Sequence, residues 1–212
     1  MVSPDQVTLV SSFRKFLPPY DAIQRRVLAS WQVADIPAVV AADQVGVEVG
    51  LVGYSNVEAL KGVRSGWSLG FKTGACLVND LLLKALPLVQ TPMAMLVGSD
   101  MEALAGLREA LEGILAGKGY NVFLDCGRGT FLSSRFWLRK MALDMPDFII
   151  GRPYWADWTR EWARRNVDGF GTVTLPLGHC DHDGRLIWLE EKAWGAKAPS
   201  AIHNAGLSNV WK

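Results

Sequence analysis

The chain has 212 residues, of which half are hydrophobic and a fifth are charged, and its formal net charge is +1 at pH 7. Such a chain is long enough to bury a full core, and its length predicts a single domain. Its near-neutral charge excludes the typical nucleic-acid-binding protein, which is strongly basic. The three cysteines have no paired spacing, and no stretch approaches about 20 consecutive apolar residues, so we expect a cytoplasmic protein that does not span a membrane.

The first part of the chain alternates apolar strands with amphipathic helices. Residues 36–43, IPAVVAAD, form a continuous apolar run that ends in an acid, which is typical of a buried parallel strand. In residues 20–33 the apolar side chains recur at helical spacing. By the same criteria we expect strands at 6–13, 49–55 and 92–101 and helices at 74–89 and 102–119.

The second part of the chain continues the pattern with shorter elements. Residues 120–126, YNVFLDC, are typical of a strand, and residues 130–143 are typical of a helix. A strand or turn then leads into a helix that ends at 166, and the remaining residues alternate short strand-like runs with loops. This alternation predicts an α/β fold with a mostly parallel sheet.

Polar residues follow the apolar strands where the strands end. Ser11 and Ser12 end the first strand, Asp43 ends the second, and Ser99 and Asp100 end the strand at 92–101. Ligands of open α/β sheets bind beyond the carboxyl ends of the strands, so we expect these residues to converge on one cleft. A structural alternative stays open, because Asp100 also suits the N-cap of the next helix and the serines suit a capping loop.

The stretch GHCDHD, residues 178–183, concentrates possible metal ligands. His179, Asp181, His182 and Asp183 permit three interpretations: a cation or diphosphate contact that folds back over the cleft, a polar turn between two strands, or part of a binuclear metallohydrolase site. The last interpretation requires several further histidines, whereas only His203 remains in the chain.

The segment GFKTGACLVNDLLLKALPLVQTPMAMLVGSDM, residues 70–101, resembles glycosyltransferases of the GT-A fold. In these enzymes a Lys or Arg and an Asn precede a strand that ends in a D-x-D-like signature. Lys72, Asn79 and Asp100 match those positions, while Gly98 stands where the first acid of the signature would be. The stretch SSFRKFLPPYDAIQRRVLASW, residues 11–31, resembles the opening strand, loop and helix of GT-A-like proteins from bacteria and their viruses.

A later stretch extends the resemblance to about residues 8–204. PDFIIGRPYWADW, residues 146–158, is similar to an F-x-I-G-R-P-x-W-D-x-W segment in which an acid faces the sugar and the acceptor. Asp157 is the matching acid, displaced by one place because Ala156 intervenes. GHCDHD lies where such proteins carry H-x-x-H-D.

The resemblance implies a GT-A-like sandwich with a nucleotide-binding half over residues 1–120 and an acceptor-binding half over residues 121–212. It implies sugar transfer from a nucleotide-diphosphate donor to a carbohydrate or other hydroxyl acceptor, assisted by Mn²⁺ or Mg²⁺. The implied cation ligands are Asp100, His179 and Asp181, and the implied general base is Asp157. The implied donor contacts are Ser11, Ser12, Arg14, Asp43, Lys72, Asn79, Asp80, Ser99 and Arg152.

Other interpretations of the same residues stay open. Lys72 also suits a solvated surface lysine, and Asp157 also suits the first turn of a helix. The missing first acid and the displaced Asp157 favour a GT-A-like module that binds a nucleotide-sugar or a protein partner without transferring a sugar. A nucleotidyltransferase, whose fold is related, is expected to carry a Gly- and basic-rich loop after the first strand, but SSFRKFLPPY has no glycine.

Overall fold

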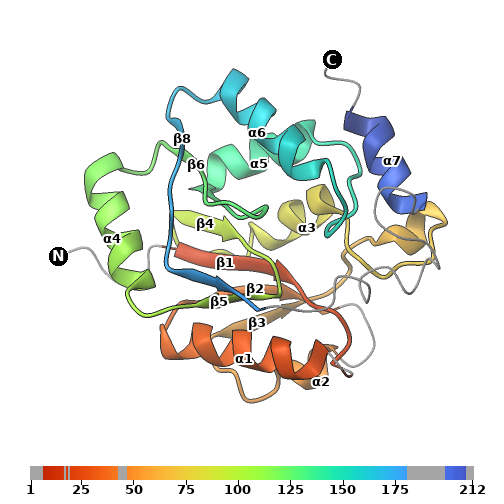
Figure 1. The fold of residues 1–212 in the computed structure, drawn as a ribbon, viewed down its shortest axis with the longest axis horizontal. Helices are drawn as coiled ribbons and strands as arrows, with labels where there is room; N and C mark the ends of the chain where they lie inside the picture. Colours follow the sequence, from red (N-terminus) through yellow and green to blue (C-terminus); the bar gives the residue numbers. More distant parts are fainter. Residues whose placement is uncertain (1–6, 17, 19, 43–46, 181–198, 209–212) are drawn as a thin grey trace.

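The computed structural model describes residues 7–16, 18, 20–42, 47–180 and 199–208. Its centre is a seven-stranded mixed sheet with helices on both faces (Figure 1), which confirms the predicted α/β fold. No helix in these ranges is long and apolar enough to cross a bilayer. The strands are β1 (Val7–Ser12), β2 (Ala38–Ala41), β3 (Val57–Leu60), β4 (Met93–Leu96), β5 (Met101–Ala103), β6 (Phe123–Asp125), β7 (Phe131–Ser134), β8 (Phe170–Thr172) and β9 (Leu177–His179).

The strand order of the large sheet is β3-β2-β1-β4-β7-β6-β8. The first four strands of this order are parallel, as the continuous apolar runs of β2 and β4 predict. The strand β3 was not expected, because its sequence VEAL is half exposed. β7 pairs antiparallel with both β4 and β6, and β8 returns parallel to β6. β5 and β9 form a separate antiparallel pair. The parallel strands β1, β2 and β4 therefore end at the same edge of the sheet.

Helices cover the two faces of the sheet (Figure 1). Their bounds are α1 (Tyr20–Val33), α2 (Val47–Leu51), α3 (Val78–Ala85), α4 (Leu107–Lys118), α5 (Arg135–Asp144), α6 (Trp155–Asn166) and α7 (Pro199–Ser208), with a 3₁₀ turn η1 (Gly66–Leu69) before α3. Helices α3, α5 and α6 pack on one face, and α1, α2 and α4 pack on the other.

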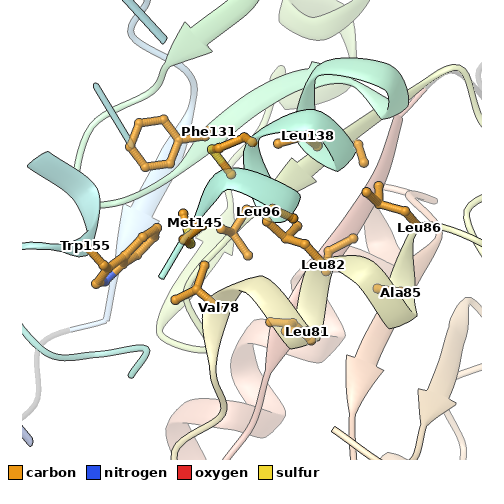
Figure 2. Close-up of a cluster of buried hydrophobic side chains, with 14 of the residues drawn as sticks. Val78, Leu81, Leu82, Ala85, Leu86, Leu96, Phe131, Leu138, Met145 and Trp155 are labelled. Carbon is orange, nitrogen blue, oxygen red and sulfur yellow. The ribbon is translucent and has the colours of Figure 1, made fainter. Parts of the chain in front are cut away.

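Each face of the sheet has its own core because successive strand residues point in opposite directions. In β1, Val10 faces α3 and α5, while Leu9 faces α1. Figure 2 shows the first core, where Leu82 of α3, Leu96 of β4 and Leu138 of α5 lie in one cluster, with the rings of Phe131 and Trp155 at its side. Trp158 and Trp162 of α6 belong to this core, as expected from their helical spacing.

One expected element is wrong, and two expected helices begin later than predicted. Residues 49–55 are not a strand, because the chain forms α2, in which Val47 and Leu51 are buried one turn apart while Val49 and Val52 are exposed. Residues 131–134 form the antiparallel strand β7 and not the start of a helix. Residues 101–103 form β5, so the helix expected from 102 begins only at Leu107.

Helix α7 was not expected from the sequence. Its buried Asn204 hydrogen-bonds both backbone groups of Ile149 and the carbonyl oxygen of Pro153. α7 thereby fixes the loop between α5 and α6, and this tertiary contact stabilises a helix that has little apolar periodicity of its own.

Candidate functional site

A cleft of about 300 Å³ opens where β1 and β4 end. Of the predicted site residues, Ser12, Arg14, Ser99 and Asp100 line it. This arrangement follows from the topology, since parallel neighbouring strands bring their carboxyl ends to one edge. The other lining residues are Tyr20, Ile23, Gln24, Ala75, Leu96, Val97, Gly98, Arg128, Gly129, Ile150, Gly151, Trp155 and Ala156.

The loop after β1 is held in place by α1. Buried Gln24 accepts a hydrogen bond from the Arg14 backbone N–H at 2.8 Å and donates one to the Arg14 carbonyl at 3.0 Å. The Arg14 guanidinium lies over the Tyr20 ring, 5.2 Å from its centroid. Ser12 reaches the sulfur of Cys76, whereas Ser11 is fully buried and donates to the carbonyl of Val97. Ser11 therefore joins two strands below the cleft.

Asp100 and His179 meet although they are far apart in the sequence. Antiparallel pairing of β5 with β9 sets His179 opposite Met101, and the Cys180 N–H donates to the Asp100 carbonyl. His179 Nε2 lies 3.3 Å from Asp100 Oδ2, and both side chains are partly exposed. The N-cap interpretation of Asp100 is wrong, because Gly106 occupies the N-cap of α4.

The rest of GHCDHD falls largely beyond the described residues. Asp181, His182 and Asp183 lie outside them, as does the predicted donor contact Asp43, so the turn interpretation stays a prediction. Within the described ranges no group of three or more His, Cys, Asp or Glu side chains is close enough to hold a metal. His203 instead contacts the carbonyl oxygen of Asp147.

The Asp100 carboxylate occupies space that is free because Gly98 has no side chain. A Cβ atom built on Gly98 would lie only 2.5 Å from Asp100 Oδ1, well inside van der Waals contact. The absence of a side chain at position 98 therefore lets the Asp100 carboxylate fold back over the backbone.

Asp157 lies in the first turn of α6, directly after Trp155 and Ala156, which line the cleft. Its side chain is 74% exposed, and its Oδ1 accepts a hydrogen bond from Arg160 at 2.7 Å. The same guanidinium binds Oδ2 of buried Asp125 at 2.6 Å. Burial lowers the pKa of Arg160, but the two carboxylates outweigh it and leave the pKa raised.

Besides Ser11, four described donor contacts that the sequence predicted lie outside the lining of the cleft. Lys72 is exposed on the loop before α3. Asn79 donates to Met145 and Asp147, and Asp80 accepts the Arg64 backbone N–H. Arg152 is 2% exposed and donates to Ser200 of α7 and to Thr73. These last three side chains join loops to helices behind the cleft.

Sequence reasoning missed the turn between β6 and β7. Arg128 lies at its tip and lines the cleft, with Gly127 and Gly129 on either side. The signal was present as GRG in DCGRGTF, because two glycines around one residue favour a tight turn. Burial raises the pKa of the neighbouring Cys126 thiol to about 12, so this cysteine stays protonated and is a poor nucleophile.

Comparisons with known proteins identify structural relatives only. No protein-family model matches the sequence, and no curated protein matches it. Among solved structures, TarS 1–349 of S. aureus in complex with UDP-GlcNAc superposes with a TM-score of 0.57 at 12% identity, covering 96% of this chain and 70% of that chain. At this identity the likeness concerns the fold alone.

Two further structures share the fold. Glucosyl-3-phosphoglycerate synthase of Mycobacterium tuberculosis, solved with Mn²⁺, UDP and glucosyl-3-phosphoglycerate, has a TM-score of 0.51 at 10% identity, over 95% of this chain and 78% of that chain. The 4-diphosphocytidyl-2C-methyl-D-erythritol synthase of Anaerococcus prevotii has a TM-score of 0.55 at 8% identity, over 87% of this chain and 94% of that chain.

Proposed function

Since this chain has the fold of the GT-A nucleotide-diphospho-sugar transferases, we propose that it transfers a sugar from a nucleotide-diphosphate donor to a hydroxyl acceptor. The observation that carries the proposal is the meeting of Ser12, Arg14, Ser99 and Asp100 in one cleft at the ends of β1 and β4. Two of the structural relatives were solved with UDP or a UDP-sugar, which supports a donor of that class.

A divalent cation fits the donor atoms of the site. Asp100 offers a carboxylate and His179 an imidazole nitrogen, and their separation of 3.3 Å lets both approach one ion. Mg²⁺ and Mn²⁺ bind through one or two carboxylates together with substrate phosphates, so two protein ligands are compatible with such a site. When bound, the cation would offset negative charge on the leaving diphosphate. Asp181 remains a proposed third ligand.

The acceptor would approach beside α6. Asp157 follows two residues that line the cleft, and its exposed carboxylate is available to take a proton from an acceptor hydroxyl. Arg160 holds that carboxylate from one side and is itself anchored to Asp125. In this role Arg160 orients the base, while Trp155 contributes apolar surface to the lining of the cleft.

The experiment combines ligand binding with turnover. UDP-GlcNAc, UDP-glucose and GDP-mannose are added with and without Mn²⁺, and both thermal melting and slow donor hydrolysis are measured. A true donor at 100 times its Kd raises the melting temperature by roughly 5–10 °C. Asp100→Asn should lower hydrolysis about 100-fold, the scale of losing one preorganised electrostatic contact. Asp168→Asn, an exposed acid on the turn before β8, is the matched control.

Two other functions give different outcomes. Gly98 in place of an acid favours a nucleotide-sugar-binding module, which would show the melting shift without any hydrolysis. The likeness to the 4-diphosphocytidyl-2C-methyl-D-erythritol synthase favours a nucleotidyltransferase, which would bind a nucleoside triphosphate more tightly than a nucleotide-sugar. Unchanged hydrolysis in Asp100→Asn would remove Asp100 from the proposed mechanism.

A further inference from the structure

The cleft holds more positive than negative charge among the described residues. Two arginines, Arg14 and Arg128, line it, and Asp100 is the one acid that these residues contribute to the same lining. In the part of the chain that the structure describes, neither arginine forms a salt bridge, whereas Arg160, close by, binds two carboxylates. Guanidinium groups that face a cleft without a carboxylate partner favour an anionic ligand, and they bind phosphate oxygens in a two-pronged geometry.

Arg128 is presented by a rigid turn. Gly127, Arg128 and Gly129 all have positive φ angles, of 82°, 50° and 71°. The Cys126 and Thr130 backbone N–H groups close the turn by donating to the carbonyl oxygens of Thr130 and Gly127, and Asp125 Oδ1 accepts the N–H of Gly127. A residue other than glycine with positive φ is uncommon, and such conformations cluster at functional sites where the surrounding structure enforces them.

Helix α6 supports this turn from behind. The Trp155 ring lies so close to Gly129 that a Cβ on the glycine would be 2.9 Å from Cζ2. Asp125, which caps the turn through Oδ1, is bound by Arg160 through Oδ2. The position of the Arg128 backbone is therefore fixed by β6 and α6 together, while its side chain remains exposed.

Arg14 is held with similar firmness on the first strand's loop. Both of its backbone groups bind the buried Gln24 amide, and its guanidinium rests on Tyr20. Two fixed loops from different parts of the sheet thus each offer one guanidinium to the same cleft. Neither loop backbone has to be ordered when a ligand binds, which lowers the entropic cost of binding.

We propose that Arg14 and Arg128 clamp the diphosphate of the donor and that a nucleoside diphosphate binds this cleft without a metal ion. The inference rests on the proposed donor class and adds how the donor is held. Gly98 removes one acid from the signature, so the cation site has fewer protein ligands. Two arginines contribute positive charge to the same cleft. Because this charge already attracts the diphosphate, a divalent cation strengthens nucleotide binding but is not required for it.

The test measures UDP binding by calorimetry in EDTA and then in Mn²⁺, with GDP and CDP in parallel. Arg128→Gly removes the side chain and suits the positive φ, so the turn keeps its conformation. In EDTA we expect wild-type protein to bind one nucleoside diphosphate, and we expect Arg128→Gly and Arg14→Ala each to weaken binding about 10- to 100-fold. Arg128→Lys should recover only part of the loss.

Controls separate the clamp from a structural effect. Arg139→Ala, which removes an exposed arginine on α5, should bind like wild type. Uridine, which has no phosphate, should bind the wild type and Arg128→Gly equally. Wild-type binding that requires Mn²⁺, or equal UDP binding by wild type and Arg128→Gly, would overturn the clamp while leaving the proposed function intact. Absence of binding by every nucleotide under both conditions would overturn both.

Discussion

At the residue scale, Gly98 determines where the Asp100 carboxylate lies. Its φ is not in the left-handed region, so an alanine is compatible with the backbone, and only the flexible end of Asp100 has to move. We expect Gly98→Ala to leave folding intact and to displace the carboxylate from His179. The Mn²⁺-dependent part of nucleotide binding should then fall, while binding in EDTA stays at the wild-type level.

The matched control for this substitution lies in the middle of α4. A Cβ atom on Gly113 would meet no other atom within 4 Å, so Gly113→Ala should raise stability by about 0.5–1 kcal/mol and leave nucleotide binding unchanged. Calorimetric titration with and without Mn²⁺ measures both variants. An equal response to Mn²⁺ in Gly98→Ala and wild type would contradict the link between Gly98 and the cation.

At the element scale, an ionic network ties α3 to the loop after α5. Arg64 binds Asp147 at 2.8 Å and Asp80 at 3.4 Å, and Asn79 also donates to Asp147. Burial raises the pKa of Asp147, but the hydrogen bonds from Asn79 and Arg64 outweigh it, so the net pKa is lowered. Burial likewise raises the pKa of Asp80, and hydrogen bonds from the Arg64 backbone and Lys84 outweigh it, so this pKa is lowered as well.

This network predicts a specific loss of stability in acid. Because both folded-state pKa values lie below the ordinary 3.8, the unfolded chain binds protons more readily than the folded chain. The stability that the two carboxylates contribute is present above that value and is lost as the pH falls through their lowered folded pKa values. Urea unfolding between pH 2 and 5 should show the decline, and Arg64→Met should flatten it. An unchanged slope in Arg64→Met would contradict the assignment.

How far the elements could be predicted depended on where their stability arises. Helix α1 was predicted within its observed bounds, because its own apolar periodicity defines it. The strand β7 was mistaken for the start of a helix. Serine is a preferred N-cap residue, and Ser134, whose side chain accepts the Trp137 N–H, marks the true start of α5. Helix α7 depends on contacts of Asn204 with a distant loop, which no local pattern reveals.

In the candidate site, too, residues placed by local patterns could be predicted and residues placed by tertiary contacts could not. Ser12, Arg14, Ser99 and Asp100 could be placed together because each follows a parallel strand, and the topology of such sheets is predictable. Arg128 comes from an antiparallel hairpin that was not expected, so GRG could indicate a turn but not that the turn approaches the cleft. Arg152 and Asn79 have the polar character of ligand-binding residues, yet both are enclosed by tertiary contacts of their own.

At the scale of the whole molecule, the two predicted halves contribute to one sheet. β4 from the first half pairs with β7 from the second over all four of its residues, and both cores include side chains from both halves. The division at residue 120 stays a prediction about ligand binding, and it does not correspond to two separate cores. We therefore expect a fragment of residues 1–120 to remain unfolded.

Circular dichroism and amide chemical-shift dispersion of the fragment provide the measurement. Without β7 and α5, the fragment would expose fully buried residues of β4 and α3, including Leu96, Leu81 and Leu82. The full-length chain under the same conditions is the control. A cooperative thermal transition of the isolated fragment would contradict this expectation and would indicate an independent nucleotide-binding domain.

During biosynthesis, Asp100 leaves the ribosome well before the histidine that meets it. At about 5–20 residues per second, the stretch up to His179 takes roughly 4–16 s to be translated. In that interval β5 lacks its paired strand and Asp100 lacks its histidine, because β9 supplies both. An mRNA that ends between the codons for Asp100 and His179 would yield a chain that carries Asp100 but lacks both β9 and His179. Completion of the site thus requires that translation has passed His179.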